Sequence, residues 1–322
     1  MRWPKRLIRR AQVASALDWG RVHPEKLPDP ALKPATPREL KTIEELNSVC
    51  LFLGPYRNLT TLTASFLFLH PNCQVLNHAG SRVLGDVSTN FLVNYSEDKF
   101  RQFCHFAITM SQGGARGSYG GSIVLSHAFA RYQEMRKVFQ KRYGNQLLKQ
   151  NIKSLVWKES ELVSQLIRKG KIDLRAIFSQ NPKLRFLMPI RNPLDCASSI
   201  VRLNMDKFYN HLGRFDVRQV LDEVLKEIRW FVGLKREFPD RFYYFYQDRV
   251  DEKGLRDLAA FLELEPEKRW LSDVLYVYQV SSTYKYETDL TAYYEKLVEK
   301  YFSDEPPIQD HLRGFTQTSR VG

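Results

Sequence analysis

Short apolar runs alternate along the chain with segments whose apolar residues recur at helical spacing. The apolar runs predict buried strands at 49–53, 73–76, 154–157, 184–190 and 242–246. The helical spacing predicts one helix that starts near residue 60 and runs to residue 69. It predicts further helices at 97–110, 129–143, 162–167, 217–237, 254–262 and 288–301. Strands that alternate with helices favour a parallel sheet with both faces covered. We therefore expect an α/β fold: a three-layer sandwich with a central, mainly parallel sheet.

The segment 49–69 has the layout of a phosphate-binding turn. A Gly-Pro pair ends the apolar run, and Asn58, Thr60 and Thr61 can cap the helix that follows. The positive end of a helix attracts an anion, and Arg57 and the threonine hydroxyls can close round it. An ordinary capped turn would show the same residues, so this stretch alone leaves both interpretations open.

A second candidate phosphate site follows the apolar run 184–190. Arg191 stands where that run ends, Asn192 can cap a helix, and Pro193 suits the first helical position. Ser199 comes eight residues after Arg191, on the same predicted helix. A guanidinium at the strand end and a hydroxyl on the helix can bracket one phosphate group.

Composition narrows the class of partner. The net charge of +13 over 322 residues indicates an anionic partner, which could be a nucleotide, a sulfated or phosphorylated substrate, nucleic acid or a membrane surface. An apolar fraction of 43% favours a globular, enzyme-like body. The four cysteines are scattered, with no C-x-x-C pair and no histidines at zinc spacing, which favours reduced thiols over a disulfide frame or a metal site.

The first forty residues differ from the rest. They begin with a basic segment, and five prolines between 22 and 40 predict an extended connector. We expect an N-terminal extension, 1–40, and a single domain, 41–322. The basic start lacks the apolar core of a signal peptide, and no apolar stretch is long enough to span a bilayer, so we expect a soluble, cytoplasmic protein. Peripheral membrane contact through the basic start is the alternative.

The two phosphate motifs together resemble those of a known enzyme family. Segment 191–199, Arg-Asn-Pro-Leu-Asp-Cys-Ala-Ser-Ser, resembles the 3′-phosphate motif of sulfotransferases that use 3′-phosphoadenosine-5′-phosphosulfate (PAPS), R-(D/N)-P-x-(D)-x-x-x-S. Segment 54–62, Gly-Pro-Tyr-Arg-Asn-Leu-Thr-Thr-Leu, looks like their 5′-phosphosulfate loop, G-x-x-(K/R)-(S/T)-G-T-(T/S)-L. The motif order is closest to the tyrosylprotein, carbohydrate-type and bacterial members. The resemblance implies a P-loop-NTPase-like sulfotransferase fold.

The likeness has further parts and some departures. It extends to four short segments, 70–72, 157–160, 246–248 and 261–262. Leu59 stands where the loop usually has glycine, and Gln247 replaces the customary glutamate. No clear glycine-and-basic motif follows near the C-terminal end, where Arg313 and Arg320 are the candidates.

The resemblance also implies roles for individual residues. The activity it implies is transfer of a sulfuryl group from PAPS to an acceptor hydroxyl or amine, with PAP as the product. As catalytic residues, Arg57 would contact the bridging and 5′-phosphate oxygens of the donor, and Lys158 would lie near the sulfuryl oxygens. The residues expected to hold the donor are Arg57, Asn58, Leu59, Thr60, Thr61, Leu62, Arg191, Ser199 and Tyr246. Of these, Arg191 and Ser199 would bind the 3′-phosphate and Tyr246 would contact adenine. No metal is required, because arginine and lysine side chains can meet the donor's charge.

The reaction also needs a base for the acceptor proton. Counted from Arg57 in step with the tyrosylprotein enzymes, His78 falls on or beside their catalytic glutamate. Imidazole has an unperturbed pKa of about 6.5, so it can accept a hydroxyl proton near neutral pH. His105 and His127 are the alternatives.

Two other functions fit part of the pattern. A P-loop kinase or NTPase that uses ATP shares the sheet and the phosphate turn, but the signature G-x-x-x-x-G-K-(S/T) is missing. A non-catalytic basic module for a nucleotide, nucleic acid or a membrane would explain the charge. No recognised nucleic-acid motif accompanies that charge, so we expect no nucleic-acid partner.

The acceptor is not encoded in any pattern of the sequence. A carbohydrate, a peptide tyrosine or a small alcohol would each suit the basic, aromatic-rich chain. The sulfotransferase interpretation makes one geometric demand. The segments that start at Arg57 and Arg191 must meet at the ends of adjacent strands, about a nucleotide's length apart.

Overall fold

A computed structural model describes residues 34–113, 120–170, 172–205, 215–280 and 284–317. Most of the predicted N-terminal extension therefore lies outside the described residues. Its last part is helical, because helix α2 (Pro37–Glu44) starts there with a complete cap. Thr36 accepts a hydrogen bond from the Glu39 N–H, the Glu39 side chain accepts one from the Thr36 backbone, and Pro37 takes the first helical position. The prediction of an extended connector up to residue 40 is wrong at this end.

Contacts within the chain define two compact units. The first comprises Met1–Phe52, Thr60–Phe186 and Asp251–Tyr278, and the second comprises Leu53–Leu59, Leu187–Val250 and Gln279–Gly322. Strand β5 (Leu184–Ile190) begins in the first unit and ends in the second. The single domain expected over 41–322 stays a prediction.

The strands follow one order, β3-β2-β4-β1-β5-β6. Their bounds are β1 (Ser48–Phe52), β2 (Cys73–Asn77), β3 (Gly121–Ser122), β4 (Ser154–Lys158), β5 (Leu184–Ile190) and β6 (Phe242–Tyr246). Strand β4 pairs in parallel with both β1 and β2, and the short β3 pairs antiparallel to β2. Every residue of β1, β2, β4 and β5 is buried, so helices cover both faces, as in other parallel sheets. The predicted α/β class with a mainly parallel sheet is confirmed.

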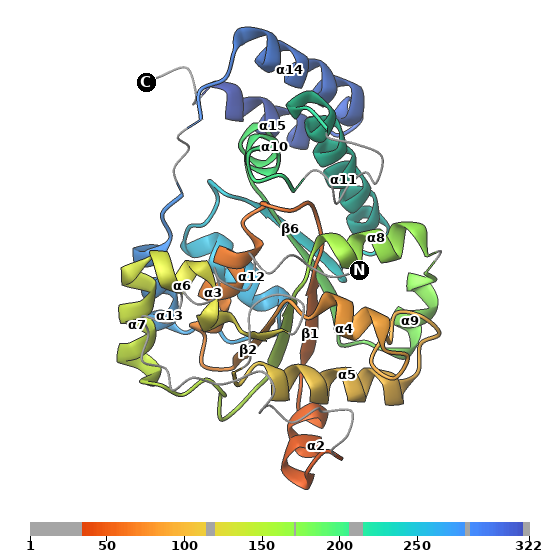
Figure 1. Cartoon of the computed structure of the whole chain (residues 1–322), viewed down its shortest axis with the longest axis vertical. Helices are drawn as coiled ribbons and strands as arrows, with labels where there is room; N and C mark the ends of the chain where they lie inside the picture. The colour runs from red at the N-terminus through yellow and green to blue at the C-terminus, as the bar shows by residue number, and fades with distance from the viewer. Residues whose placement is uncertain (1–33, 114–119, 171, 206–214, 281–283, 318–322) are drawn as a thin grey trace. The chain divides into compact units, whose positions relative to one another are not determined.

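The helices of the first unit surround its part of the sheet. They are α2, α3 (Thr60–Phe68), α4 (Gly80–Gly85), α5 (Glu97–Met110), α6 (His127–Arg131), α7 (Gln133–Tyr143), α8 (Glu161–Lys169), α9 (Leu174–Gln180), α12 (Glu252–Phe261) and α13 (Lys268–Val277). Helices α3 and α5 both pack against β2 and β4 (Figure 1). The side chains between them form the core of this unit.

One predicted helix, 129–143, is two helices in the structure. Tyr132 has extended backbone (φ −92°, ψ 92°) and separates α6 from α7. The buried side chains Ala128, Met135 and Phe139 are seven and four residues apart, so they keep helical spacing across the break. The apolar pattern therefore continues through the break and could not reveal it.

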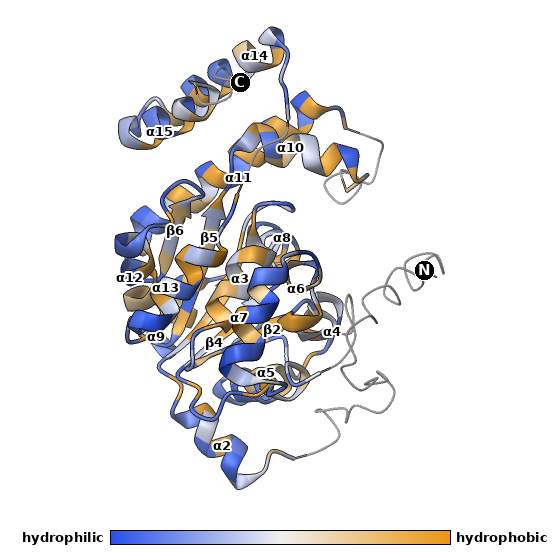
Figure 2. Ribbon diagram, turned by 90° about the vertical axis from the view of Figure 1, so that its left-hand side faces the viewer, coloured by the Kyte–Doolittle hydropathy of each residue, from blue (hydrophilic) through white to orange (hydrophobic). Residues whose placement is uncertain are grey.

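The second unit has four helices among its described residues. They are α10 (Pro193–Arg202), α11 (Val217–Glu237), α14 (Thr288–Phe302) and α15 (Pro306–Gln317). Helix α11 mixes apolar and charged residues along its length (Figure 2). It packs against α10, α14 and β6. An Asp216–Gln219 capping box fixes its start where the sequence predicts it.

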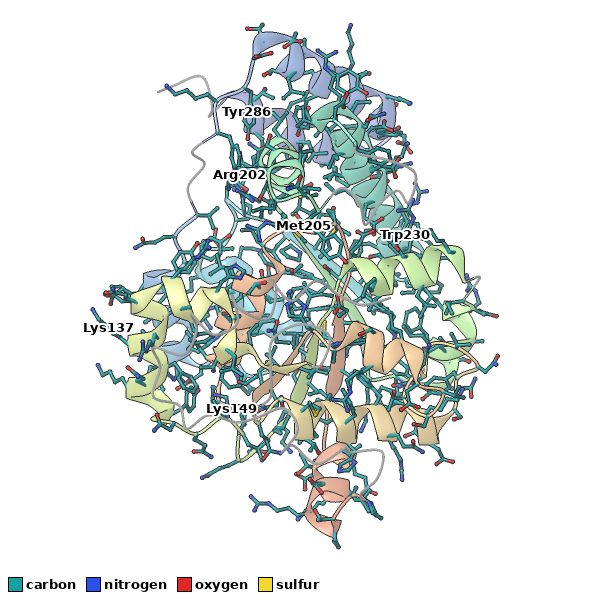
Figure 3. All side chains as sticks on the ribbon, viewed as in Figure 1. Lys137, Lys149, Arg202, Met205, Trp230 and Tyr286 are labelled. Atoms are coloured by element: carbon teal, nitrogen blue, oxygen red, sulfur yellow. The ribbon has the colours of Figure 1, made fainter. Side chains whose placement is uncertain are left out.

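Lys149, labelled in Figure 3, is a buried amine in the first unit. The residue is 4% exposed, and Nζ lies 3.1 Å from the ring centroid of Tyr143 and 4.3 Å from that of Phe68. No hydrogen-bond partner for Nζ exists among the described residues. The ring faces favour the ammonium form by about 2 kcal/mol, whereas lost hydration costs several times more. Burial therefore lowers the pKa of Lys149 to about 6.

We predict that Lys149→Met stabilises the protein at pH 7 and removes a pH dependence. An unfolded lysine has a pKa of about 10.4. Between about pH 6 and 10 the unfolded chain therefore binds a proton that folded Lys149 does not, so the free energy of unfolding rises with pH across this window. Urea unfolding at several pH values measures the rise, which the variant should lack. Lys137→Met, at an exposed lysine, is the control. Equal pH slopes for wild type and Lys149→Met would contradict the prediction.

Candidate active site

The loop 53–59 joins β1 to α3 and belongs to the second unit. Three of its residues have left-handed backbone: Gly54 (φ 106°), Arg57 (φ 66°) and Leu59 (φ 58°). Left-handed backbone costs a residue with a side chain roughly 1–2 kcal/mol. Leu59 nevertheless adopts it at the position where the resembled motif has glycine. Alternation of handedness turns successive N–H groups to one side, which is the geometry of anion-binding loops.

Asn58 fixes this loop against the end of β5. Its side chain is 1% exposed, and Oδ1 accepts a hydrogen bond of 2.8 Å from the Arg191 N–H. The side-chain Nδ2 is buried and has no hydrogen-bond partner among the described residues. The sequence interpretation placed Asn58 at the donor. The structure gives its oxygen a structural role, as acceptor of the hydrogen bond from the Arg191 N–H.

The first predicted phosphate motif meets the second directly. Arg57 Nε donates to Ser199 Oγ at 2.9 Å, although the two residues lie 142 positions apart. Arg191 Nη1 lies 3.4 Å from the Arg57 carbonyl oxygen. Arg57 has left-handed backbone, and its side chain reaches Ser199 in α10. Because Arg191 contacts the Arg57 carbonyl oxygen, the two arginines are closer than the nucleotide's length expected from the sequence.

Arg191 is also held by Asp195 of helix α10, which starts two residues after it. Nη2 lies 3.4 Å from Oδ2 of Asp195, whose side chain is fully buried in the first turn of α10. The Arg191 side chain is 12% exposed, and its Nε has no hydrogen-bond partner among the described residues. Two buried donors, Arg191 Nε and Asn58 Nδ2, therefore lack an acceptor in this cluster. An anionic oxygen is the acceptor that suits both.

Residues from the C-terminal part complete this region, and no sequence motif pointed to them. The Tyr286 hydroxyl donates to Oδ1 of Asp195, and the rings of Tyr284 and Tyr286 stack with centroids 6.3 Å apart. The guanidinium of Arg202 lies over the Tyr284 ring, 5.1 Å from its centroid; Figure 3 labels Tyr286 and Arg202 beside α10. Arg313, a candidate from sequence, pairs with Glu299, and Arg320 lies outside the described residues.

Tyr246, predicted to contact adenine, ends strand β6. One ring face stacks on His311, with centroids 3.6 Å apart and planes 15° from parallel. His311 Nε2 in turn lies 2.9 Å from Asp248 Oδ1. Burial, followed by the neighbouring Tyr244 and Asp248, raises the pKa of Tyr246 far above its ordinary value. Because His311 covers one face of the Tyr246 ring, only the other face could stack on a base. The next residue, Gln247, accepts a hydrogen bond from the Asn192 N–H at the start of α10.

The remaining catalytic candidates lie in the first unit. Strands β2 and β4 are parallel with Asn77 opposite Lys158, so their carboxyl ends are adjacent and His78 follows directly. The His78 N–H donates to the Lys158 carbonyl at 3.1 Å, and Trp157 Nε1 donates to the His78 carbonyl at 2.7 Å. The Lys158 side chain is 7% exposed and the His78 side chain 29%. The backbones of His78 and Lys158 are thus adjacent at the carboxyl ends of β2 and β4.

Glu159 is a further residue of this group, and the sequence interpretation assigned it no role. Its Oε2 lies 3.8 Å from His78 Nδ1 and accepts a hydrogen bond of 3.2 Å from the Gly80 N–H. Burial opposes ionisation, but His78, Lys158 and the Gly80 N–H together hold the pKa of the Glu159 carboxyl below its ordinary value. Glu159 is therefore a buried carboxylate beside the candidate base.

The other predicted residues have ordinary helical surroundings. Thr60, Thr61 and Leu62 form the first turn of α3, in the first unit, where the Thr61 carbonyl accepts from Ser65 Oγ. His105 Nε2 lies 3.6 Å from Glu39 Oε2, and His127 begins α6.

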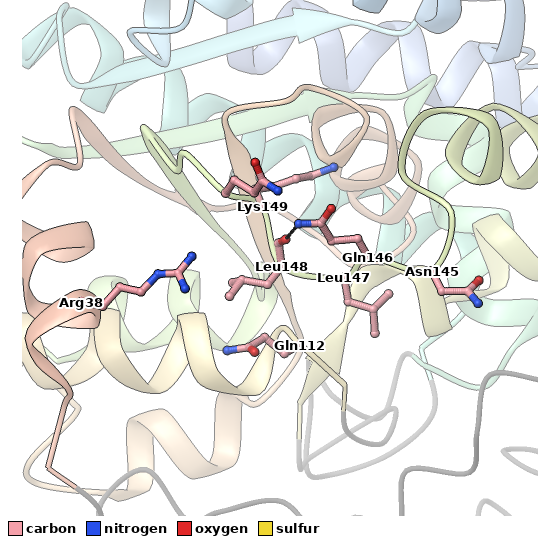
Figure 4. Close-up of a pocket in the computed structure, with 8 residues that line it drawn as sticks. Arg38, Gln112, Asn145, Gln146, Leu147, Leu148 and Lys149 are labelled. Carbon is pink, nitrogen blue, oxygen red and sulfur yellow. Dashed lines mark hydrogen bonds between the residues drawn. The ribbon is translucent and has the colours of Figure 1, made fainter.

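One pocket of about 320 Å³ lies in the first unit. It is lined by Arg38, Gln112 and the segment 145–150 (Figure 4). None of the predicted site residues lines it. Within the part of the chain that the structure describes, no group of three or more His, Cys, Asp or Glu side chains could hold a metal ion. Within that same part, none of the helices combines the length and apolar character needed to cross a bilayer.

Three solved structures of sulfotransferases resemble the chain. The mouse sulfotransferase SULT7A1, solved in complex with PAP, matches 87% of this chain and 94% of its own, at 8% identity and a TM-score of 0.43. Sulfotransferase STF9 from Mycobacterium avium matches 93% of this chain and 84% of its own, at 12% identity and a TM-score of 0.40. The sulfotransferase domain of the Synechococcus PCC 7002 olefin synthase matches 78% and 94%, at 14% identity and a TM-score of 0.35.

The sequence comparisons found no match, either among family models or among curated proteins. Because the three structural likenesses have TM-scores of 0.43 and below, we base the functional proposal on the residues of this chain.

We predict that Gly54→Ala destabilises the second unit, whereas Gly233→Ala does not. A Cβ at Gly54 would lie 2.9 Å from Met188 Cε, on backbone with φ 106°. The expected loss in the free energy of unfolding is about 1–3 kcal/mol. A Cβ at Gly233, inside α11, would have no neighbouring atom within 4 Å, so alanine there should stabilise by about 0.5–1 kcal/mol. Urea unfolding measures both changes, and equal effects would contradict the role given to Gly54.

Proposed function

We propose that this protein is a sulfotransferase that moves a sulfuryl group from PAPS to an acceptor hydroxyl or amine. The observation that carries the proposal is the cluster in the second unit. Arg57, Arg191 and Ser199 come from two distant segments and converge. Two buried donors of this cluster, Arg191 Nε and Asn58 Nδ2, have no acceptor among the described residues. Such a cluster suits a multiply charged phosphate.

The donor's 3′-phosphate is the group we place at this cluster. Arg191 would present its guanidinium and Ser199 its hydroxyl, which Arg57 holds at 2.9 Å. Arg57 has a second role in the proposal, at the bridging and 5′-phosphate oxygens, with Asn58, Leu59, Thr60, Thr61 and Leu62. The buried Asp195 holds Arg191 on one side and accepts from Tyr286 on the other, which restricts the guanidinium to few orientations.

The transfer itself needs a base and a cation. A bond forms between the acceptor oxygen or nitrogen and the sulfur, while the bond from sulfur to the 5′-phosphate oxygen breaks and its electron pair stays on the phosphate. His78 would take the acceptor proton, and the Lys158 ammonium would stabilise charge on the sulfuryl oxygens. Both side chains lie at the carboxyl ends of parallel strands, where ligands bind in open α/β sheets.

The acceptor in this proposal is a carbohydrate, a peptide tyrosine or a small alcohol. Transfer of a phosphoryl group from ATP is the competing function, since kinases share the sheet and the turn. The 3′-phosphate separates the two, because ATP carries none. The pair Arg191 and Ser199 has no partner in ATP, and this favours PAPS.

We predict that Arg191→Ala weakens binding of PAP. Removing a charge-assisted contact to phosphate should cost about 1.5–3 kcal/mol, or roughly a 10- to 100-fold loss of affinity. Isothermal titration calorimetry with PAP measures it. Arg313→Ala is the matched control, because Arg313 pairs with Glu299 and should bind PAP as the wild type does. An unchanged affinity in Arg191→Ala, or a loss in Arg313→Ala alone, would refute the placement of the 3′-phosphate.

We predict that His78→Ala lowers turnover by roughly 10²- to 10⁴-fold while PAP affinity stays near the wild-type value. Transfer from labelled PAPS to an acceptor found by screening measures turnover, and calorimetry measures affinity. His105→Ala is the control, because His105 lies on α5, where its side chain is beside Glu39 of α2. Turnover of His78→Ala comparable to that of the wild type would remove this histidine from the mechanism.

A further inference from the structure

At the corner between β2 and α4, close packing fixes the position of the Glu159 side chain beside His78. A Cβ on Gly80 would lie 2.8 Å from Cγ, Cδ and Oε2 of Glu159. Gly80 has no left-handed φ, so its backbone conformation would accept alanine, and the three atoms nearest to an added Cβ all belong to Glu159. The Gly80 N–H donates to that same carboxylate oxygen. The glycine thus admits the Glu159 side chain and holds it in place.

The backbone on the other side of the pair is strained. His78 (φ 62°) and Ala79 (φ 76°) both have left-handed backbone, although neither is glycine. Each such residue costs about 1–3 kcal/mol and persists only where the surroundings enforce it. Here the Trp157 indole and the Lys158 carbonyl hold the His78 backbone, and a Cβ at Gly120 would lie 2.5 Å from Ala79 Cβ. The corner therefore keeps the imidazole beside the carboxylate.

The end of strand β4 and helix α4 both carry charged residues at this corner. Glu159 and Lys158 come from the end of β4, and both side chains are under 10% exposed. On α4, the guanidinium of Arg82 lies over the Phe106 ring, 4.9 Å from its centroid, and near Met110. Glu159 is the group whose contact with the imidazole is explicit: Oε2 lies 3.8 Å from Nδ1, an ion-pair distance that is too long for a hydrogen bond.

We infer that Glu159 is the positioning residue of His78. Its carboxylate draws Nδ1 of the imidazole toward itself, favours the protonated ring and leaves Nε2 as the nitrogen that takes a proton from the acceptor. Nδ1–H beside a fixed carboxylate sets the tautomer in which Nε2 is the basic nitrogen. The transfer of an acceptor proton to Nε2 rests on the proposed function. The electrostatic coupling between Glu159 and His78 does not.

The test is an NMR titration of the His78 imidazole in the whole protein, with its signal identified by its loss in His78→Ala. Glu159→Gln keeps an oxygen for the Gly80 N–H and removes the charge. Because the imidazolium loses its anionic partner, the His78 midpoint should fall by about one pH unit or more. The acid limb of the pH profile of kcat/KM should move with it.

Two further variants make the result decisive. Gly80→Ala leaves the charge in place but pushes the carboxylate away, so the His78 midpoint should fall by less than in Glu159→Gln. Glu39→Gln, which removes the carboxylate beside His105, is the matched control and should leave the His78 midpoint unchanged. If Glu159→Gln does not fold, Gly80→Ala decides the question.

A His78 midpoint that stays within about 0.2 pH units of the wild-type value in a folded Glu159→Gln or Gly80→Ala variant would overturn the inference. Failure of the proposed function would look different. In that case PAPS and PAP would not bind, while the shift of the His78 midpoint would still be observed.

Discussion

Two hydrogen bonds tie the loop 53–59 to Arg191 at the end of β5 and to Ser199 in α10, and the candidate nucleotide site depends on them. Asn58 accepts from the Arg191 N–H, and Arg57 donates to Ser199. Without the first, the oxygen of the buried Asn58 side chain would lose its hydrogen bond to the backbone, and the loop would lose its attachment to the end of β5. Without the second, the arginine and the serine of two distant motifs would have no common site. Both bonds lie within the second unit, so the cluster is defined by that unit alone.

Strained backbone marks both candidate sites. Seven non-glycine residues in the described part of the chain have positive φ, and four of them are Arg57, Leu59, His78 and Ala79. Two belong to the arginine cluster and its loop, and two form the corner beside Glu159. Since such backbone persists only where neighbouring contacts enforce it, its concentration at these two places indicates that both are built to hold side chains in fixed directions.

Sequence patterns predicted the regular elements well where caps and apolar periodicity agree. The helices α5 and α11 have the predicted bounds, because Ser96 and Asp216 cap their first turns and their buried residues keep one spacing. Several elements escaped. Five helices were not predicted, namely α2, α4, α9, α13 and α15, and two further features left no pattern to find. Strand β3 has two residues, too few for an apolar run, and the break at Tyr132 leaves the spacing of its neighbours intact.

The sequence also named the motif residues of the candidate site, but it could not predict their contacts. A local pattern cannot show that Arg57 turns toward Ser199, since that direction goes with a left-handed backbone that the sequence would assign to glycine. Nor could it show that Tyr286 reaches Asp195 or that His311 covers one face of Tyr246, because these partners come from the C-terminal part of the chain. Such contacts depend on tertiary packing.

The central claim is that Arg57, Arg191 and Ser199 form a site for the 3′-phosphate of a nucleotide. The most direct measurement is calorimetric titration of the wild-type protein with PAP, with 5′-AMP, which lacks only the 3′-phosphate, and with ATP. The account predicts that PAP binds at least about 10-fold more tightly than 5′-AMP or ATP, as expected for a charge-assisted contact worth about 1.5 kcal/mol or more. Equal affinity for PAP and 5′-AMP, or tighter binding of ATP, would contradict it.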